Sequence, residues 1–298
     1  MQLPLVMAVL SGVLYAVAAL GYKMAERLNC RTSIFIVVFS LAGGAFAIIK
    51  SFSETSEWGN PRLWFLGIVM GILFDLAIYF IMQSNKNGPA SISWTMLQLS
   101  LLVPVILSPV LFQERVYWVD PVIIATFILM LGFFAQSLRK TDDSVEKKTR
   151  KYFLYLLGIF FSNGFFLLGN KMKYEFFEEK NTAALTFIVY LVGGVIAWLV
   201  STRESEKLKI TVAEWKAGAL TGLSNGMGTI FYLAAMSLPA TVVFPLSASI
   251  GLLGGVILTT GVYGEKFDLY KTIAMVMGLV ALLFAIFREQ IVLNLGFV

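Results

Sequence analysis

TSIFIVVFSLAGG occupies Thr32–Gly44, and TAALTFIVYLVGG occupies Thr182–Gly194, 150 residues later. Each stretch opens on threonine, continues as an apolar run and closes on a pair of glycines. The chain is therefore expected to contain an internal repeat. Shorter matches occur in the same order at nearly the same offset: Gly21-Tyr22-Lys23-Met24 with Gly169-Asn170-Lys171-Met172, Gly67 and Gly71 with Gly218 and Gly222, Pro89-Ala90 with Pro239-Ala240, and Gln113-Glu114-Arg115 with Gly264-Glu265-Lys266.

The composition of the chain is typical of an integral membrane protein. Of the 298 residues, 58% are hydrophobic and 14% are charged, whereas soluble domains carry about 25% charged residues. A membrane-spanning helix needs roughly 20 mostly apolar residues. Ten stretches qualify: Leu3–Tyr22, Thr32–Ile49, Leu63–Met82, Pro89–Phe112, Trp118–Leu138, Tyr152–Asn170, Thr182–Val200, Glu214–Ala235, Ala240–Tyr263 and Leu269–Phe287.

The repeat divides these stretches evenly between two halves of the chain. Residues 1–138 form the first half, residues 152–298 form the second, and residues 139–151 are a basic linker. Five helices are an odd number, so the second half must enter the membrane from the opposite side. The sequence therefore predicts an all-α membrane protein with ten transmembrane helices arranged as two inverted five-helix repeats. Many transporters have this architecture, with the binding site near the midplane between the repeats.

The charged and reactive residues exclude several classes of protein. The net charge of +5 comes from basic residues spread over short gaps between apolar runs, so a nucleic-acid partner is not expected. Cys30 is the sole cysteine, and histidine is absent, so we expect no disulfide, metal site, cofactor or catalytic residue. The chain also lacks the Gly-x-x-x-x-Gly-Lys-Ser/Thr loop of an ATPase. A membrane-embedded enzyme stays open as a less favoured alternative.

Asp75 is the first candidate for function because it lies about two-thirds along the third predicted helix. A charged residue at such depth is costly and usually faces the interior of the bundle or water. Asp75 is therefore a candidate for proton coupling or for contact with a cation, and a structural carboxyl is the alternative. Other polar and aromatic residues at depth are expected to line one substrate pocket with it: Tyr15, Tyr79, Trp94, Gln98, Asn163, Asn225 and Ser247.

Pro104 and Pro245 each remove a backbone hydrogen bond from a predicted helix. At membrane depth such a break is tolerated only where protein or a wet cavity satisfies the freed carbonyl. Both prolines therefore indicate either a cavity or a fixed kink. Lys23 and Lys171 end equivalent helices and are expected to extend toward the membrane surface, and charges of a vestibule that attract anionic groups are the alternative.

The ordered motifs resemble those of the drug/metabolite transporter superfamily, EamA-like branch. That pattern has a proline-alanine entry to the fourth helix, an internal proline and a glycine-glutamate-basic exit, repeated in the ninth helix. Pro89-Ala90, Pro104 and Gln113-Glu114-Arg115 match it in the first half, and Pro239-Ala240 and Gly264-Glu265-Lys266 match it in the second. Gln113 departs from the usual glycine, and Gly254-Gly255 stands in place of the second internal proline.

The resemblance implies a secondary transporter, with export favoured, and its central cavity would lie among helices one, three, four, six, eight and nine. We expect the carrier to act on small polar or amphipathic metabolites such as amino acids. A cation or magnesium pathway is the alternative. The expected location is the cell (inner) membrane, with lipid and a small-molecule substrate as partners and a homodimer left open. The distribution of basic residues favours both termini outside, whereas the resemblance favours cytoplasmic termini.

Overall fold

The computed structural model describes residues 2–87, 96–141, 150–177, 180–203, 210–263, 269–287 and 291–293. Within these ranges the protein is all-helical and contains no strand. The helices are α1 (Gln2–Arg27), α2 (Thr32–Ser51), α3 (Pro61–Asn87), α5 (Leu102–Phe112), α6 (Val119–Thr141), α7 (Arg150–Phe177), α8 (Thr182–Arg203), α9 (Val212–Ala234), α10 (Ala240–Tyr263) and α11 (Leu269–Ile286).

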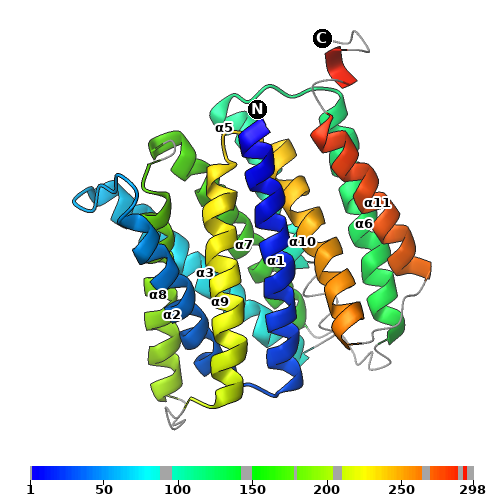
Figure 1. Ribbon diagram of the computed structural model, residues 1–298. Helices are drawn as coiled ribbons and strands as arrows, with labels where there is room; N and C mark the ends of the chain where they lie inside the picture. Colours follow the sequence, from blue (N-terminus) through cyan, green and yellow to red (C-terminus); the bar gives the residue numbers. More distant parts are fainter. Residues whose placement is uncertain are drawn as a thin grey trace.

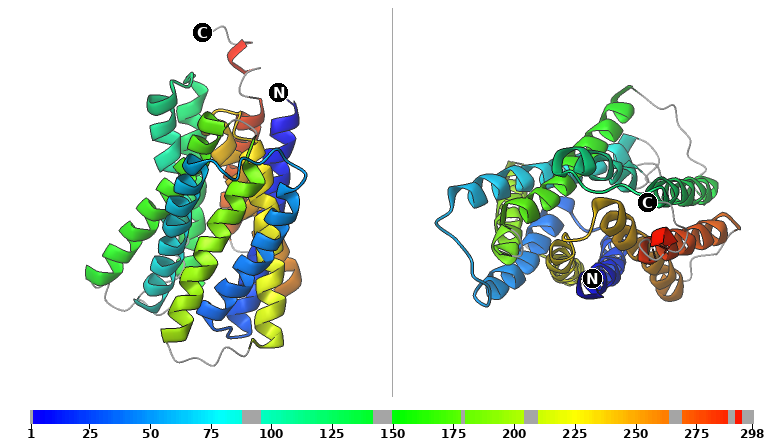
Figure 2. Two further views of the ribbon diagram at one scale, coloured as in Figure 1. Left: turned by 90° about the vertical axis from the view of Figure 1, so that its left-hand side faces the viewer. Right: turned by 90° about the horizontal axis from the view of Figure 1, so that it is seen from above.

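The helices form one bundle, and their axes are roughly parallel or antiparallel to one another (Figures 1 and 2). Among the described residues, five helices are long and apolar enough to cross a membrane, namely α1, α2, α3, α7 and α8. The shorter apolar helical segments are Met96–Phe112, Val119–Phe133, Ala240–Gly255 and Thr272–Ala281. Large apolar side chains such as Phe65 (72% exposed) and Trp198 (47% exposed) lie on the outer surface. An apolar exterior of this extent suits a membrane protein, because lipid covers it without cost.

Helices that are distant in sequence pack against one another. Helix α1 packs against α9 and α10, and α2 packs against α8 and α9. Helix α3 packs against α7 and α8, and α6 packs against α11. The helices α2 and α8 run in opposite directions, and α1 begins at the same end of the bundle where α11 ends (Figure 1). Every one of these pairings joins residues before position 142 to residues after position 149. The two parts of the chain therefore form one interlocked body.

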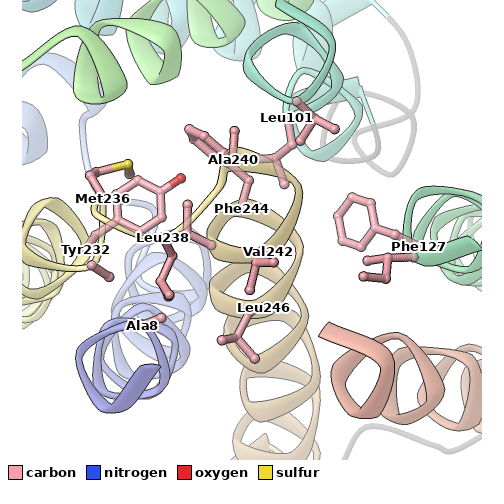
Figure 3. Packing of buried hydrophobic residues seen from close by; sticks show 14 of the residues in the cluster. Ala8, Leu101, Phe127, Tyr232, Met236, Leu238, Ala240, Val242, Phe244 and Leu246 are labelled. Carbon is pink, nitrogen blue, oxygen red and sulfur yellow. The ribbon is translucent and has the colours of Figure 1, made fainter. Parts of the chain in front are cut away.

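The largest apolar core lies where α1, α5, α6, α9 and α10 meet. The buried side chains of Phe244 and Leu246 extend from α10 into this core, which also includes Tyr232 from α9, Ala8 from α1 and Phe127 from α6 (Figure 3). The helix α10 is therefore buried along much of its length. Its sequence is apolar on all sides, which would suit a lipid-facing helix equally well.

The fourth predicted span is not one continuous helix. Residues 96–99 are helical, Ser100–Leu101 form a turn, and α5 begins at Leu102. Pro104 explains the break, because it has no N–H to donate to the carbonyl of Ser100 four residues earlier. The Val103 N–H bonds to that carbonyl instead, at 3.0 Å. Pro104 was expected to mark a cavity or a fixed kink within the stretch Pro89–Phe112, and the structure has a turn there; residues 88–95 lie outside the described ranges.

Glycines set the distance between the central helices, and one pair of substitutions tests this. A Cβ on Gly222 would collide with the carbonyl oxygen of Phe39 in α2, whereas a Cβ on Gly132 in α6 would meet nothing within 4 Å. We expect Gly222→Ala to destabilise the protein by about 1–3 kcal/mol, because α2 and α9 must separate. We expect Gly132→Ala to be neutral or to stabilise by about 0.5–1 kcal/mol.

The measurement is the thermal unfolding midpoint of both variants in one detergent. Equal midpoints for the two variants would show that contact between α2 and α9 does not limit stability.

Candidate functional site

Hydroxyl and amide groups from three helices meet on one face of α9. The Tyr190 hydroxyl of α8 donates to Asn225 Oδ1 at 2.6 Å. The hydroxyl groups of Tyr15 in α1 and Thr229 in α9 lie 3.3 Å apart. Asn225 and Thr229 are four residues apart, so they share a helix face. The structure therefore brings together two residues that the sequence predicted for a site, Tyr15 and Asn225, and adds Tyr190 and Thr229.

A second pair of hydroxyl groups lies one helical turn away along α1. Ser11 and Ser247, both buried, have their oxygens 2.6 Å apart between α1 and α10. The Ser11 hydroxyl also donates to the Ala8 carbonyl at 2.8 Å. Ser247 was predicted for the site, and the structure places it in this direct contact between helices.

An aromatic cluster continues from Tyr190 into the other helices. The Tyr190 ring lies 5.4 Å from Phe39 in α2 and 6.1 Å from Phe74 in α3, measured between ring centroids. Phe39 and Phe74 stack at 6.0 Å, and Phe74 meets Phe166 of α7 at 5.3 Å. This aromatic cluster offers apolar walls beside the hydroxyl and amide groups of the α9 face.

Asp75 follows Phe74 on α3 and lies against a glycine of α8. A Cβ on Gly193 would stand 3.3 Å from Asp75 Oδ1, so the carboxyl packs close to the backbone of α8. Asp75 Oδ1 is buried and has no hydrogen-bond partner among the described residues. At the next residue of α8, a Cβ on Gly194 would stand 3.0 Å from the Cβ of Ser40 in α2. The Ser40 hydroxyl is likewise buried, with no partner in the described part of the chain.

Asn163 lies apart from the α9 face, at the helix break before Pro104. Its Nδ2 donates to the Ser100 hydroxyl at 2.6 Å and lies 3.4 Å from the carbonyl oxygen of Leu97. The Ser100 hydroxyl donates to the same Leu97 carbonyl at 2.5 Å. The Ser100 and Asn163 side chains therefore supply hydrogen-bond donors to a backbone carbonyl beside the break. Such a partner is what a helix broken at membrane depth requires.

Three further residues were predicted for the pocket: Gln98, Tyr79 and Trp94. Gln98 is half-buried in the helical segment 96–99. Tyr79 is 50% exposed, and its ring packs edge-on against Phe80. Trp94 lies outside the described residues. The assignment of these three residues to a pocket stays a prediction.

Lys171 is buried, so the expectation that its ammonium extends to the surface is wrong. Its side chain is 3% exposed, and its Nζ lies 2.5 Å from Glu114 Oε1. It also donates to the carbonyl oxygens of Met236 and Leu238, at 3.0 and 3.3 Å. Glu114 Oε2 in turn accepts the Ala240 N–H at 2.9 Å, at the start of α10. This Lys171–Glu114 cluster connects Glu114, two residues after α5, to α7 and to the connection between α9 and α10.

A second ionic cluster joins α2 to α9. Arg31 Nε donates to Glu214 Oε1 at 2.8 Å, and the Glu214 side chain is 2% exposed. Glu214 also forms a capping box with Thr211 at the start of α9. Burial, and secondarily the nearby Glu214 carboxylate, raises the pKa of Cys30 in the connection between α1 and α2. The sole cysteine is therefore poorly placed to react as a thiolate.

Acidic residues do not gather around Asp75 in the part of the chain that the structure describes. No group of three or more His, Cys, Asp or Glu side chains there could hold a metal ion.

Among known proteins, the chain is similar to a solved structure, and the similarity concerns the fold. No protein-family model matches the chain, and no curated protein matches it. A solved structure described only as "Crystal structure of protein" is similar, with a TM-score of 0.76 and 14% sequence identity. The match covers 95% of this chain and 98% of that chain. The chain therefore shares its whole fold with a protein determined by crystallography.

Proposed function

We propose that the protein is a secondary carrier of small polar or amphipathic metabolites such as amino acids, working by alternating access between two inverted five-helix repeats. The repeats are residues 1–138 and 152–298, and each would cross the cell's inner membrane five times. The observation that carries this proposal is the equivalence of glycine contacts between the two halves.

The first equivalent contacts join α3 to α8 and α9 to α2. A Cβ on Gly67 would meet the Ile188 side chain at 2.6 Å, and a Cβ on Gly218 would meet the Val38 side chain at 2.8 Å. Gly67 and Gly218 are 151 positions apart, and Val38 and Ile188 are 150 apart. Exchanging the two halves of the chain therefore converts one contact into the other.

The next helical turn repeats the relation. A Cβ on Gly71 would approach Val192, and a Cβ on Gly222 would approach Ala42, which is 150 positions before Val192. The helix packing follows the same exchange, since α1 packs on α9 as α7 packs on α3. The equivalent helices α2 and α8 run in opposite directions (Figure 1). These relations support a two-fold axis in the membrane plane, which inverted repeats require.

The interior between the halves supports a polar or amphipathic substrate. Tyr15, Asn225 and Thr229 supply hydrogen-bonding groups, and the aromatic cluster supplies apolar walls. Ligand sites commonly combine a few placed polar groups with aromatic lining. Asp75 would add the coupling or substrate-binding carboxyl within the same bundle.

Alternating access requires one end of the pathway to close while the other opens. We place the Lys171–Glu114 cluster at one such closure, because it joins the first half to the second. Its groups come from the end of α5, from α7 and from the connection before α10. The Glu114 and Pro239-Ala240 motifs that resemble the EamA-like branch meet in this cluster, which is consistent with membership of that branch, with export as the direction.

Uptake into proteoliposomes tests the proposed function. Purified protein would be reconstituted and given a pooled, labelled metabolite mixture, with protein-free liposomes of the same lipid as the control. We expect saturable uptake of one chemical class above the control. Folded, reconstituted protein that takes up no member of the pool would contradict the carrier function.

A further inference from the structure

A groove lies between α2 and α8, which stand side by side at the edge of the bundle opposite α6 and α11 (Figure 1). The groove has a volume of about 460 Å³, and eleven residues line it. None of these eleven residues carries a charge. Tyr190 is one of them, and its hydroxyl is engaged with Asn225. The groove therefore suits an apolar occupant.

The two walls of the groove come from equivalent positions of the two repeats. Positions 37, 40, 41, 44 and 45 of α2 line it, and so do the five positions of α8 that lie 150 residues later. Two of these five pairs are identical. In the other three pairs α8 has the larger side chain: Phe187 for Val37, Tyr190 for Ser40 and Val195 for Ala45. The groove is therefore a hollow that small side chains of α2 leave beside a bulky wall of α8.

The groove is continuous with the apolar exterior of the bundle. Leu41, Leu191 and Trp198 line it and are 59%, 42% and 47% exposed, so the groove opens outward. Both helices are long and apolar enough to cross a membrane, and the lining residues occupy their middle turns. In a bilayer the opening would therefore face the hydrocarbon core, which the acyl chains of the lipids form.

The dimensions of the groove fit one hydrocarbon chain better than a helix of another protein. Its lining on α8 extends from Phe187 to Trp198, which is about 16 Å at a rise of about 1.5 Å per residue. The volume spread over that length gives a cross-section of about 30 Å², whereas a helix about 10 Å across needs roughly 80 Å². Eleven lining residues are also fewer than the about 20–30 that each side of a stable protein interface supplies.

We propose that this groove binds one acyl chain of a membrane phospholipid. The chain would lie along the small side chains of α2, with Phe187 and Trp198 on its other side. An empty groove leaves its lining without contacts on one side, whereas a bound chain gains dispersion contacts with both helices. The site does not depend on the carrier function, because it faces the lipid.

The fluorescence of Trp198 reports the bound chain, because brominated acyl chains quench a tryptophan that they contact. Purified protein in detergent would be titrated with phosphatidylcholine that carries bromine on its acyl chains. Each protein would be compared with its own Trp198→Phe counterpart, so that the difference in signal comes from Trp198. We expect saturable quenching of this signal in the wild type. Ala45→Phe places a ring in the groove and should need at least tenfold more lipid for half quenching.

Two further variants make the titration specific. Val110→Phe adds the same ring to a residue of α5 that is 76% exposed, and it should keep the wild-type lipid concentration at half quenching. Gly44→Ala is a milder change within the groove, since its Cβ would stand 3.4 Å from the Tyr190 Cβ, in ordinary contact. It should fold as the wild type does and weaken lipid binding at least threefold.

Quenching that never saturates would overturn the site, because it would show only random encounters with lipid in the micelle. Unchanged half quenching in folded Ala45→Phe would overturn it too, and if that variant does not fold, unchanged half quenching in Gly44→Ala would do so. A wild-type dimer in the same detergent, with Trp198 shielded from the brominated lipid, would overturn it in favour of a second copy of the chain.

Discussion

Lys171→Met lowers the stability of the protein by about 3–5 kcal/mol, because it removes one partner of a buried ion pair and leaves the other uncompensated. Glu114 would keep its bond to the Ala240 N–H but lose the ammonium at 2.5 Å. The carbonyl oxygens of Met236 and Leu238 would lose a donor as well. The measurement is the shift of the thermal unfolding midpoint in detergent.

Two companion variants separate this explanation from a general sensitivity to mutation. Lys216→Met removes an exposed lysine of α9 and should change stability by less than about 0.5 kcal/mol. The double variant Lys171→Met/Glu114→Gln removes both charges and should be more stable than Lys171→Met alone, because the uncompensated carboxylate is gone. A Lys171→Met midpoint equal to that of Lys216→Met would show that the Lys171–Glu114 cluster does not stabilise the fold.

Asp75→Asn is expected to have the largest effect on transport. We expect an imposed pH gradient to accelerate uptake by the wild-type protein in proteoliposomes, because a carboxyl inside the bundle can carry the coupling proton. An amide cannot bind and release that proton. The variant should therefore lose at least tenfold in uptake rate and respond to no gradient.

Glu57→Gln is the matched control, since it neutralises an exposed carboxyl in the connection between α2 and α3 that contacts Asn60. Its uptake should match that of the wild type. Wild-type kinetics and an intact response to the gradient in Asp75→Asn would assign Asp75 a structural role only.

The sequence predicted the helices well, because their signal is local. Apolar runs bounded by polar gaps gave α10 its observed bounds, Ala240–Tyr263, whereas α7 runs seven residues beyond its predicted end at Asn170. The helix break before Pro104 was foreshadowed by the missing N–H of proline. Its place at Ser100–Leu101 was missed, because a hydropathy pattern reads through a single turn.

The site was harder to predict, because its members meet through helix rotation and packing. Tyr15 and Asn225 were chosen as polar residues at depth, and the structure brings them to one face of α9. Tyr190 was missed, although the repeat itself offered the signal: it occupies the position of Ser40 in the first half. Lys171 was misjudged because a lysine near a helix end is usually at the surface, and only the tertiary fold brings Glu114 to it.

Counterflow tests the central claim, that the two halves form a carrier, most directly. Proteoliposomes would be preloaded with the unlabelled metabolite pool, or left empty, and then given the labelled pool at the same outside concentration. A carrier that alternates between two states should take up label faster into loaded vesicles, because the site returns loaded with substrate. Equal rates into loaded and empty vesicles, or rates no higher than in protein-free vesicles, would contradict a carrier built from two alternating halves.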